Sequence, residues 1–437
     1  FADDTTFEET PSDGITLELL LNVEVTDSPF DDGLTMVNFS VYETDNSNVS
    51  QVIQEPVIIG VETSVPQLEI TKGAVATSKA GATFDPATVG PSQITYNSPG
   101  SVPSILIVPS FSSSDLDSEP VESTIEDVDA GDLITFMLVI ENAGSQDAFD
   151  IEFDDTLPAG FVVPGGGLNL QIYEANGSIL LPVVNYTGGL FGSGGTSVSM
   201  DGAYTLDGLD AATEDGGLNE GGNILIATYD LEVDTDVEPL ETITNDASVL
   251  SFAAQSGGVN FVTNQEEQFE ASSDATIADL SYDKTVFTTD QAHTPGTAVV
   301  PGEGVTIGEV VTYSVPVTIP EGTTPNIILN DNIPGRLGYF IDNGVTVSGA
   351  ADCASPGVPA NIFAGTLPTP TVTTPLGAGI ASSGADLQIT FTDAIASEDN
   401  DETNNTFCVQ YDVVVLNVGG NVSGTNRQNS VVLTYGT

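Results

Sequence analysis

Basic residues are almost missing from this chain of 437 residues, which carries 5 lysines and arginines against 64 aspartates and glutamates, a formal net charge of −59. Such a charge repels nucleic acids and anionic membrane surfaces, so nucleic acid is excluded as a partner. High salt screens the repulsion, and divalent cations neutralise it. Both conditions favour an extracellular location, secreted or attached to a cell surface, although the cytoplasm of a salt-accumulating halophile also fits.

Several other features are scarce. The single histidine, His293, excludes a histidine-based zinc site and a duplicated catalytic triad. No apolar run reaches about 18 residues, so we expect no membrane insertion. No glycine-rich phosphate-binding loop precedes a helical pattern. The sequence therefore has few of the residues and motifs that common enzyme classes use.

Apolar residues and turn residues are plentiful. Hydrophobic residues make up 40% of the chain, and 45 glycines and 25 prolines separate short runs rich in valine and isoleucine. The hydrophobic fraction predicts a folded chain with buried cores. Period-2 alternation between turn signals is typical of antiparallel strands, so we predict an all-β protein.

Two segments share one plan and indicate an internal repeat. Residues 131–161 and 308–340 each contain two alternating strands followed by Asp, one residue, Leu or Ile, and Pro. Residues 223–233 resemble 406–416, with Tyr229-Asp230 matching Tyr411-Asp412, and closing strands follow at 244–252 and 427–435. The chain is thus expected to hold two copies of a β-domain.

The repeats predict tandem Ig-like β-sandwich domains with long loop insertions. We expect the C-terminal half of a repeat at 1–64, completed by other sequence or by another molecule. A full repeat follows at 65–254 with an insertion at 73–130, then a linker at 255–277 and a second full repeat at 278–437.

These motifs resemble the bacterial and archaeal surface repeat called domain of unknown function 11, and are also similar to fimbrial isopeptide-forming domains. The resemblance rests on Gly131, Asp132, Thr135, Phe136, Asn142, Gly144, Asp155, Thr156, Leu157, Pro158, Gly160, Asn245, Ala247 and Val249. The last repeat matches more loosely, because it lacks the Asn-x-Gly turn and has Asp331-Asn332-Ile333-Pro334. The resemblance implies Ig-like sandwiches in long surface proteins and no enzymatic activity on an outside substrate.

Two of the chain's three lysines, Lys72 and Lys284, end the first strand of each repeat. If the first and last strands lie side by side, each lysine meets an aspartate and an asparagine. A buried lysine loses its proton and becomes a nucleophile, and a protonated aspartate can polarise the carboxamide. Attack would release ammonia and form an isopeptide bond. The candidate sets are Lys72, Asp155, Asn245 and Lys284, Asp331, Asn429.

Simpler interpretations stay open for these residues. The lysines could guard exposed strand edges against aggregation, or form ordinary ion pairs with aspartate. Asp154 and Asp150 are alternative partners in the first set. The two cysteines, Cys353 and Cys408, predict a disulfide in an extracellular protein, and two buried free thiols are the alternative.

Three acidic clusters carry oxygen ligands at close spacing in glycine-rich or polar stretches, which suits calcium. None has the spacing of a known calcium loop, and a solvated acidic surface is the alternative. The candidate ligands are Asp115, Asp117, Asp207, Asp210, Asp215, Asp399 and Asp401.

The sequence favours a structural role, as a subunit of a secreted filament, fimbria-like fibre or surface stalk. The incomplete first repeat predicts head-to-tail assembly with copies of itself by strand addition. The alternatives are an adhesin that binds a host or neighbouring-cell ligand through loops such as 163–222, and a surface-layer protein.

Overall fold

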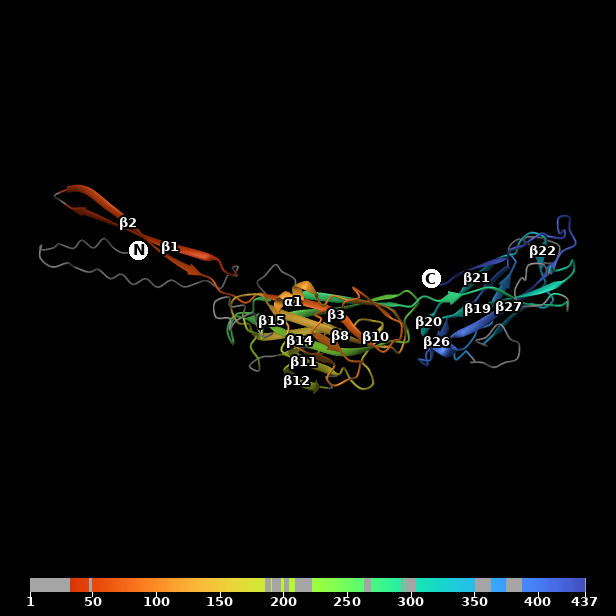
Figure 1. Ribbon diagram of the computed structural model, residues 1–437, viewed down its shortest axis with the longest axis horizontal. Helices are drawn as coiled ribbons and strands as arrows, with labels where there is room; N and C mark the ends of the chain where they lie inside the picture. The colour runs from red at the N-terminus through yellow and green to blue at the C-terminus, as the bar shows by residue number, and fades with distance from the viewer. Residues whose placement is uncertain are drawn as a thin grey trace.

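The computed structural model consists almost entirely of β-strands, and Figure 1 shows a projecting hairpin, a middle domain and a last domain in a row. It describes residues 32–46, 49–184, 190, 198–199, 204–208, 222–262, 269–291, 294, 304–349, 363–374 and 387–436. The middle and last domains are each a β-sandwich with its own hydrophobic core, so the tandem Ig-like all-β prediction is confirmed.

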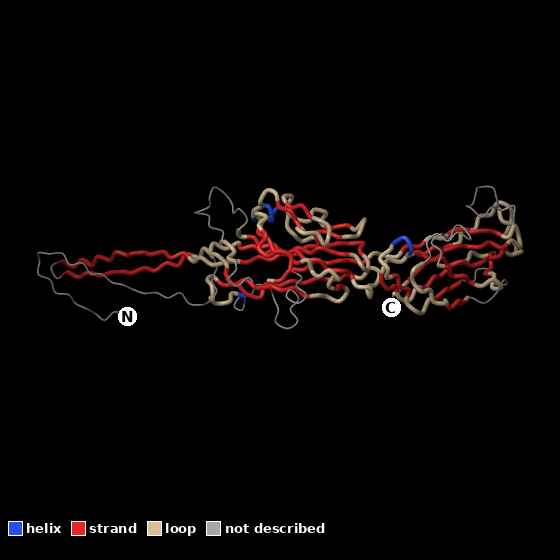
Figure 2. The backbone as a smooth tube through the Cα atoms, turned by 90° about the horizontal axis from the view of Figure 1, so that it is seen from below, coloured by secondary structure: helices blue, strands red, loops and turns tan. Residues whose placement is uncertain are grey.

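The hairpin consists of β1 (Thr35–Asn46) and β2 (Val49–Glu62), which pair antiparallel as a two-stranded sheet. Figure 2 shows it reaching away from the two domains. At its base, Asp32 accepts hydrogen bonds from the backbone N–H groups of Val65 and Ser145, at 2.8 and 2.9 Å. Its exposed apolar side chains are Leu34, Met36, Val37, Ile58, Ile59 and Val61.

Two six-stranded sheets build the middle domain. The first runs β12–β11–β14–β8–β3 with β10 paired to β14, and the second runs β13–β9–β15–β16–β7–β4. The strands of the first sheet are β3 (Leu68–Thr77), β8 (Leu133–Asn142), β10 (Phe161–Val162), β11 (Leu170–Glu174), β12 (Ile179–Val184) and β14 (Ile224–Val233). Those of the second are β4 (Thr83–Asp85), β7 (Thr124–Val128), β9 (Phe149–Thr156), β13 (Val198–Ser199), β15 (Thr242–Ala253) and β16 (Glu270–Ile277).

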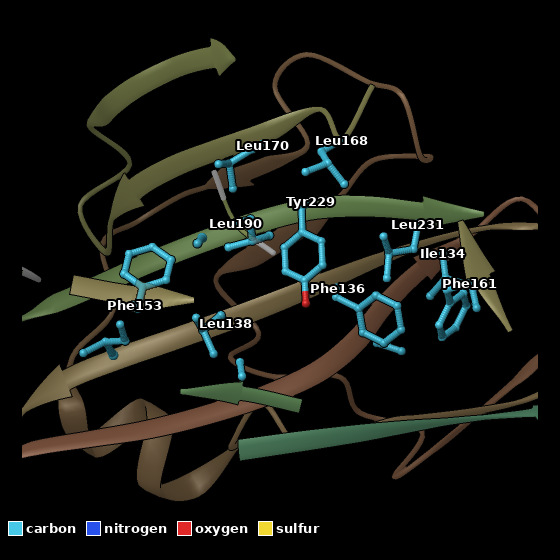
Figure 3. Packing of buried hydrophobic residues seen from close by; sticks show 14 of the residues in the cluster. Ile134, Phe136, Leu138, Phe153, Phe161, Leu168, Leu170, Leu190, Tyr229 and Leu231 are labelled. Atoms are coloured by element: carbon cyan, nitrogen blue, oxygen red, sulfur yellow. The ribbon is translucent and has the colours of Figure 1, made fainter. Parts of the chain in front are cut away.

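The central strands β8 and β14 have near-continuous apolar sequences because both of their faces are covered. Phe136 and Leu138 of β8 enter the core between the two sheets, together with Tyr229 of β14 (Figure 3). Met137 and Val139 point the other way, into a second cluster that also holds Phe111. By contrast, β15 alternates between buried and exposed residues, as expected for a strand with one solvated face.

The insertion supplies that second cluster and lies against the outer face of the first sheet. It contains β5 (Ile94–Tyr96), β6 (Ile105–Ile107) and the helix α1 (Ser113–Ser118), besides β4 and β7 of the second sheet. Gly73 of β3 permits its close approach, since a Cβ there would lie 2.8 Å from the backbone N of Ser123. The segment predicted as an insertion from residue 73 is therefore packed, and β3 continues to Thr77.

The last domain repeats the sandwich with a core that includes Phe391 and Phe407, whose rings meet edge-on at 5.8 Å. One sheet holds β17 (Ser281–Tyr282), β18 (Thr285–Thr289), β19 (Val310–Thr318), β22 (Leu337–Tyr339), β23 (Val345–Ser348) and β27 (Thr406–Val415). The facing sheet holds β21 (Ile328–Asn332), β24 (Thr371–Thr373), β25 (Leu387–Thr390) and β28 (Ser430–Thr434). A third, two-stranded sheet pairs β20 (Gly322–Thr324) with β26 (Ile395–Ser397).

Two expectations need correction. Residues 255–277 were predicted to be a linker, but β16 within them pairs with β15 and, in parallel, with β7. The cross-link hypothesis assumed that the first and last strands of a repeat can lie side by side, but β3 pairs with β8 in one sheet, whereas β15 belongs to the other. Among the described residues, no helix is long and apolar enough to cross a membrane.

Candidate functional site

Lys72 and Asp155 meet inside the middle domain. Lys72 lies on β3 of one sheet and Asp155 on β9 of the other, and the lysine Nζ donates to Asp155 Oδ2 at 2.6 Å. Neither side chain is exposed to solvent. The ion pair therefore joins the two sheets through the core, which excludes the interpretation of Lys72 as a guard of an exposed strand edge.

Asn245 and Tyr229 complete this arrangement. Asn245 is fully buried on β15, the neighbour of β9. Its Nδ2 donates to the Tyr229 hydroxyl at 3.1 Å, and the tyrosine in turn donates to Asp155 Oδ2. The second oxygens, Asp155 Oδ1 and Asn245 Oδ1, are buried without a hydrogen-bond partner among the described residues. Asp155 Oδ2 thus accepts hydrogen bonds from Lys72 and Tyr229, and the Tyr229 hydroxyl accepts one from Asn245.

Burial brings the two charged groups close to exchanging a proton. Desolvation lowers the pKa of Lys72 to about 8, although the Asp155 charge opposes the change. Desolvation also raises the pKa of Asp155 to about 6, against the opposing effect of Lys72. The rings of Phe136 and Tyr229 lie 5.6 and 5.8 Å from the lysine Nζ and keep water away. The neutral amine and the neutral acid are therefore accessible forms near neutral pH.

The last domain repeats the contacts of the lysine, the aspartate and the tyrosine. Lys284, between β17 and β18, donates to Asp331 of β21, and Tyr411 of β27 donates to the same carboxylate oxygen. Desolvation lowers the pKa of Lys284 and raises that of Asp331. Asn429, directly before β28, lies near Asp331 and the Tyr313 hydroxyl, but both of its amide atoms are buried without a hydrogen-bond partner among the described residues.

The two sites differ in one aromatic residue. In the middle domain, Phe136 is the antiparallel partner of Tyr229. In the last domain, Tyr313 takes the place of Phe136 as the partner of Tyr411. The Lys284 Nζ lies 4.6 Å from the centre of the Tyr313 ring.

The fold thus connects Lys72, Asp155 and Asn245 by hydrogen bonds, and it pairs Lys284 with Asp331 while Asn429 lies near them without a hydrogen bond among the described residues. The two tyrosines were missed. Tyr229-Asp230 and Tyr411-Asp412 align between the repeats, so a signal was present without a role attached to it. Of the alternative partners, Asp150 accepts a hydrogen bond from the Gly257 backbone at the surface.

The predicted disulfide involves one described residue. Cys408 is buried on β27 and forms a disulfide bond, so it is not a free thiol. Its predicted partner Cys353, the only other cysteine of the chain, lies outside the described residues.

The predicted calcium ligands include residues that already accept local hydrogen bonds. Asp115 accepts from Ser112 at the start of α1, and Asp401 accepts from Thr403 at the start of the 3-10 turn η2 (Glu402–Asn404). Within the described ranges, no group of three or more metal-ligating side chains has a geometry that could hold an ion. Asp210 and Asp215 lie outside those ranges, and calcium binding stays a prediction for Asp115, Asp117, Asp207, Asp399 and Asp401.

Comparison with known proteins gives a fold likeness alone. No family model and no curated protein matches the chain, so the resemblance to domain of unknown function 11 is not confirmed. Solved structures that align with it include the C-terminal domain of the Streptococcus pyogenes antigen I/II-family protein AspA, at 12% identity and a TM-score of 0.22, over 72% of this chain and 92% of that one.

The T6 backbone pilin of serotype M6 Streptococcus pyogenes aligns at 12% identity and a TM-score of 0.24, over 65% of this chain and 57% of the pilin. The collagen adhesin from S. aureus aligns at 12% identity and a TM-score of 0.18, over 72% and 83%. TM-scores this low carry no conclusion about function.

Proposed function

We propose that this chain is a force-bearing structural module of an extracellular fibre or surface stalk, and that each of its two sandwich domains is cross-linked by an intramolecular Lys–Asn isopeptide bond. The proposal is supported by the twofold occurrence of a lysine and a buried tyrosine that donate to one oxygen of a buried aspartate, with an asparagine nearby, at equivalent places in two domains. Only three lysines occur in the chain, and two of them take part.

The chemistry follows from the contacts of Lys72. Transfer of its proton to Asp155 gives a neutral amine and a carboxylic acid, both favoured by burial. The amine attacks the Cγ of Asn245, an N–C bond forms, and ammonia leaves. Charge cannot be stabilised by water in this core, so the carboxyl group must supply and accept the protons of the reaction.

The expected consequence is mechanical and thermodynamic. One bond would join β3 to β15. The other would join the segment between β17 and β18 to the residue directly before β28. Both bonds would lie near the two ends of their domains. By analogy with disulfides, closing a loop of about 100 residues removes unfolded-state entropy worth about 5 kcal/mol, and these loops are longer. A pulling force would then travel through covalent bonds and leave the sandwiches folded.

The hairpin supports the further proposal that copies of the chain assemble with one another. Apolar side chains such as Val37 (58% exposed), Ile58 (66%) and Ile59 (60%) project from a sheet of only two strands. Exposed strand edges pair readily with strands of another molecule. Analytical ultracentrifugation tests this, because removing residues 1–64 should abolish self-association if the hairpin mediates it. Association that survives the truncation would contradict it.

The adhesin alternative lacks support of this kind. About half of the loop region 163–222 that would hold a ligand, 29 of its 60 residues, lies outside the described residues. The proposed function therefore includes no external substrate and no ligand beyond a second copy of the chain.

Single-molecule force spectroscopy on the full chain tests the mechanical proposal. We expect the stretches between Lys72 and Asn245 and between Lys284 and Asn429 to contribute no extension when the ends are pulled. A Lys72→Met variant, used as the matched control, should regain the extension of the middle domain alone. Extension of both domains in the unmodified protein would contradict the proposal.

A further inference from the structure

We propose that Tyr229 is a catalytic residue of the cross-linking reaction, which relays a proton from Asp155 to the leaving nitrogen of Asn245; this inference rests on the isopeptide chemistry proposed above. The Tyr229 hydroxyl contacts Asp155 Oδ2 on one side and lies 3.1 Å from Asn245 Nδ2 on the other. It is therefore the group that touches both the acid and the nitrogen that must leave.

The relay protonates the leaving nitrogen of Asn245, which the lysine and the aspartate do not contact. An amide nitrogen leaves only after it has gained a proton. Asp155 Oδ2 contacts the lysine and the tyrosine, and its other oxygen has no hydrogen-bond partner among the described residues. The path of hydrogen bonds from Asp155 to Asn245 Nδ2 therefore runs through the Tyr229 hydroxyl.

The direction of the hydrogen bonds changes during the reaction. In the unreacted amide, Nδ2 can only donate, and it donates to the tyrosine oxygen. When the Lys72 amine attacks Cγ, the carbon becomes tetrahedral and Nδ2 gains a free lone pair. Nδ2 then accepts the tyrosine proton while the tyrosine takes the proton that Asp155 received from Lys72.

The step balances in protons and bonds. The lysine ammonium loses two protons. The first passes to Asp155 before the attack, and the second passes to the same carboxylate after Asp155 has given its first proton to Tyr229. Nδ2 gains one proton, which it takes from Tyr229, and leaves as ammonia when its bond to Cγ breaks. The oxyanion on Oδ1 returns to a carbonyl, and Asp155 ends protonated. Tyr229 gives its proton to Nδ2 as it takes one from Asp155, so no tyrosinate forms, in keeping with a phenol whose pKa burial raises well above its usual value.

The last domain provides an independent variant of the same design. Tyr411 contacts Asp331, and Tyr313 takes the position that Phe136 occupies in the middle domain. Asn429 lies near the Tyr313 hydroxyl, but both of its amide atoms are buried without a hydrogen-bond partner among the described residues. A phenol hydroxyl therefore lies near the asparagine in both domains, and in the middle domain the two form a hydrogen bond. The middle domain depends on Tyr229 for it, because Phe136 has no hydroxyl.

The test is a time course of bond formation in the full chain after a short pulse of cell-free synthesis. Peptide mass spectrometry follows the link between residues 72 and 245 and, as an internal control, the link between 284 and 429. We expect Tyr229→Phe to slow the first link by about a hundredfold and leave the second unchanged. Adding Phe136→Tyr, which copies the last domain, should restore part of the rate.

A second measurement keeps the inference testable if Tyr229→Phe does not fold. Two protons move together in the relay. A plot of the rate of bond formation in the unmodified chain against the fraction of D2O in the solvent should therefore fall as a curve rather than as a straight line. A rate unchanged by D2O, or an unchanged rate in a folded Tyr229→Phe chain, would overturn the relay and leave the cross-link intact. Absence of the 72–245 link from the unmodified chain would instead refute the cross-link itself, and the relay with it.

Discussion

The Nζ of Lys79 in the middle domain lies 2.7 Å from Glu402 Oε1 in the last domain, and also 2.7 Å from Asp129 Oδ2. The neighbouring backbone adds to this junction, since Glu321 donates its N–H to Asp129 and accepts the N–H of Ala130. All three lysines of the chain therefore have structural partners: two lie inside the domains, and one joins them.

Replacing Lys79 by Met should loosen the junction. The change leaves the buried Asp129 carboxylate without its cation, and we expect a loss of about 1–3 kcal/mol in the free energy of unfolding. Small-angle X-ray scattering should show a broader range of overall dimensions. Glu402→Gln is the control, because its side chain is 58% exposed and an exposed pair contributes less than about 1 kcal/mol. Equal effects of the two variants would argue against a buried junction.

Removing the acid should prevent cross-linking in one domain only. Asp155→Asn leaves the amine without a proton acceptor and breaks a buried ion pair, which costs about 3–5 kcal/mol. We expect the intact mass to fall short of the sequence mass by one ammonia rather than two. Asp154→Asn on the same strand is the matched control and should retain both links. A chain with Asp155→Asn that still carries two links would exclude the acid's role.

The pH dependence of the free energy of unfolding can be measured in Asn245→Ala, a variant that cannot form the cross-link to Lys72. The pKa of Asp155 is raised to about 6, so the folded state holds an extra proton between about pH 4 and 6, and stability falls as the pH rises through that window. The pKa of Lys72 is lowered to about 8, so the folded state has lost a proton that the unfolded state keeps, and stability rises from about pH 8 to 10.

Denaturant unfolding across pH 4 to 10 measures both windows. The control adds Lys72→Met and Asp155→Leu to Asn245→Ala, which removes the pair and leaves every other acid in place. The difference between the two curves should therefore have its minimum between pH 6 and 8. A flat difference would show that neither pKa is displaced by burial.

Reduction should destabilise the last domain without affecting the middle one. Cys408 is buried near the start of β27, and loss of its disulfide is expected to lower the free energy of unfolding by about 2–4 kcal/mol. Thermal unfolding with and without reductant measures the effect, and a non-reducing peptide map identifies the partner. A Cys408→Ser chain that unfolds like the oxidised protein would contradict the prediction.

Period-2 alternation and the repeat allowed much of the architecture to be predicted. The half-buried pattern of β15 and the paired motifs around Asp155 and Asp331 are local signals, and they were sufficient to select six site residues. β16 was missed because its sequence, EASSDATI, is short and polar, with only Ser273, Ala275 and Ile277 turned inward. Its strand conformation is decided by pairing with β15, which is a tertiary effect.

The roles of Tyr229 and Tyr411 were also beyond the sequence. A tyrosine in an apolar strand has the pattern of an ordinary core residue, and only the arrangement of both sheets shows that its hydroxyl reaches an aspartate from the facing sheet. The sequence likewise led to the expectation that the lysine and asparagine strands would be neighbours. The structure brings these residues together through the core instead, which is the arrangement that desolvates the lysine.

The intact mass of the full chain, reduced and denatured, decides whether the two isopeptide bonds form. Two isopeptide bonds predict a mass lower than the sequence mass by two ammonia molecules, with cross-linked peptides that join Lys72 to Asn245 and Lys284 to Asn429. The Lys72→Met variant should show a deficit of one, and Lys72→Met with Lys284→Met none. A mass equal to that of the sequence would contradict the account, and the two sites would then be buried ion pairs that stabilise the sandwiches without any covalent bond.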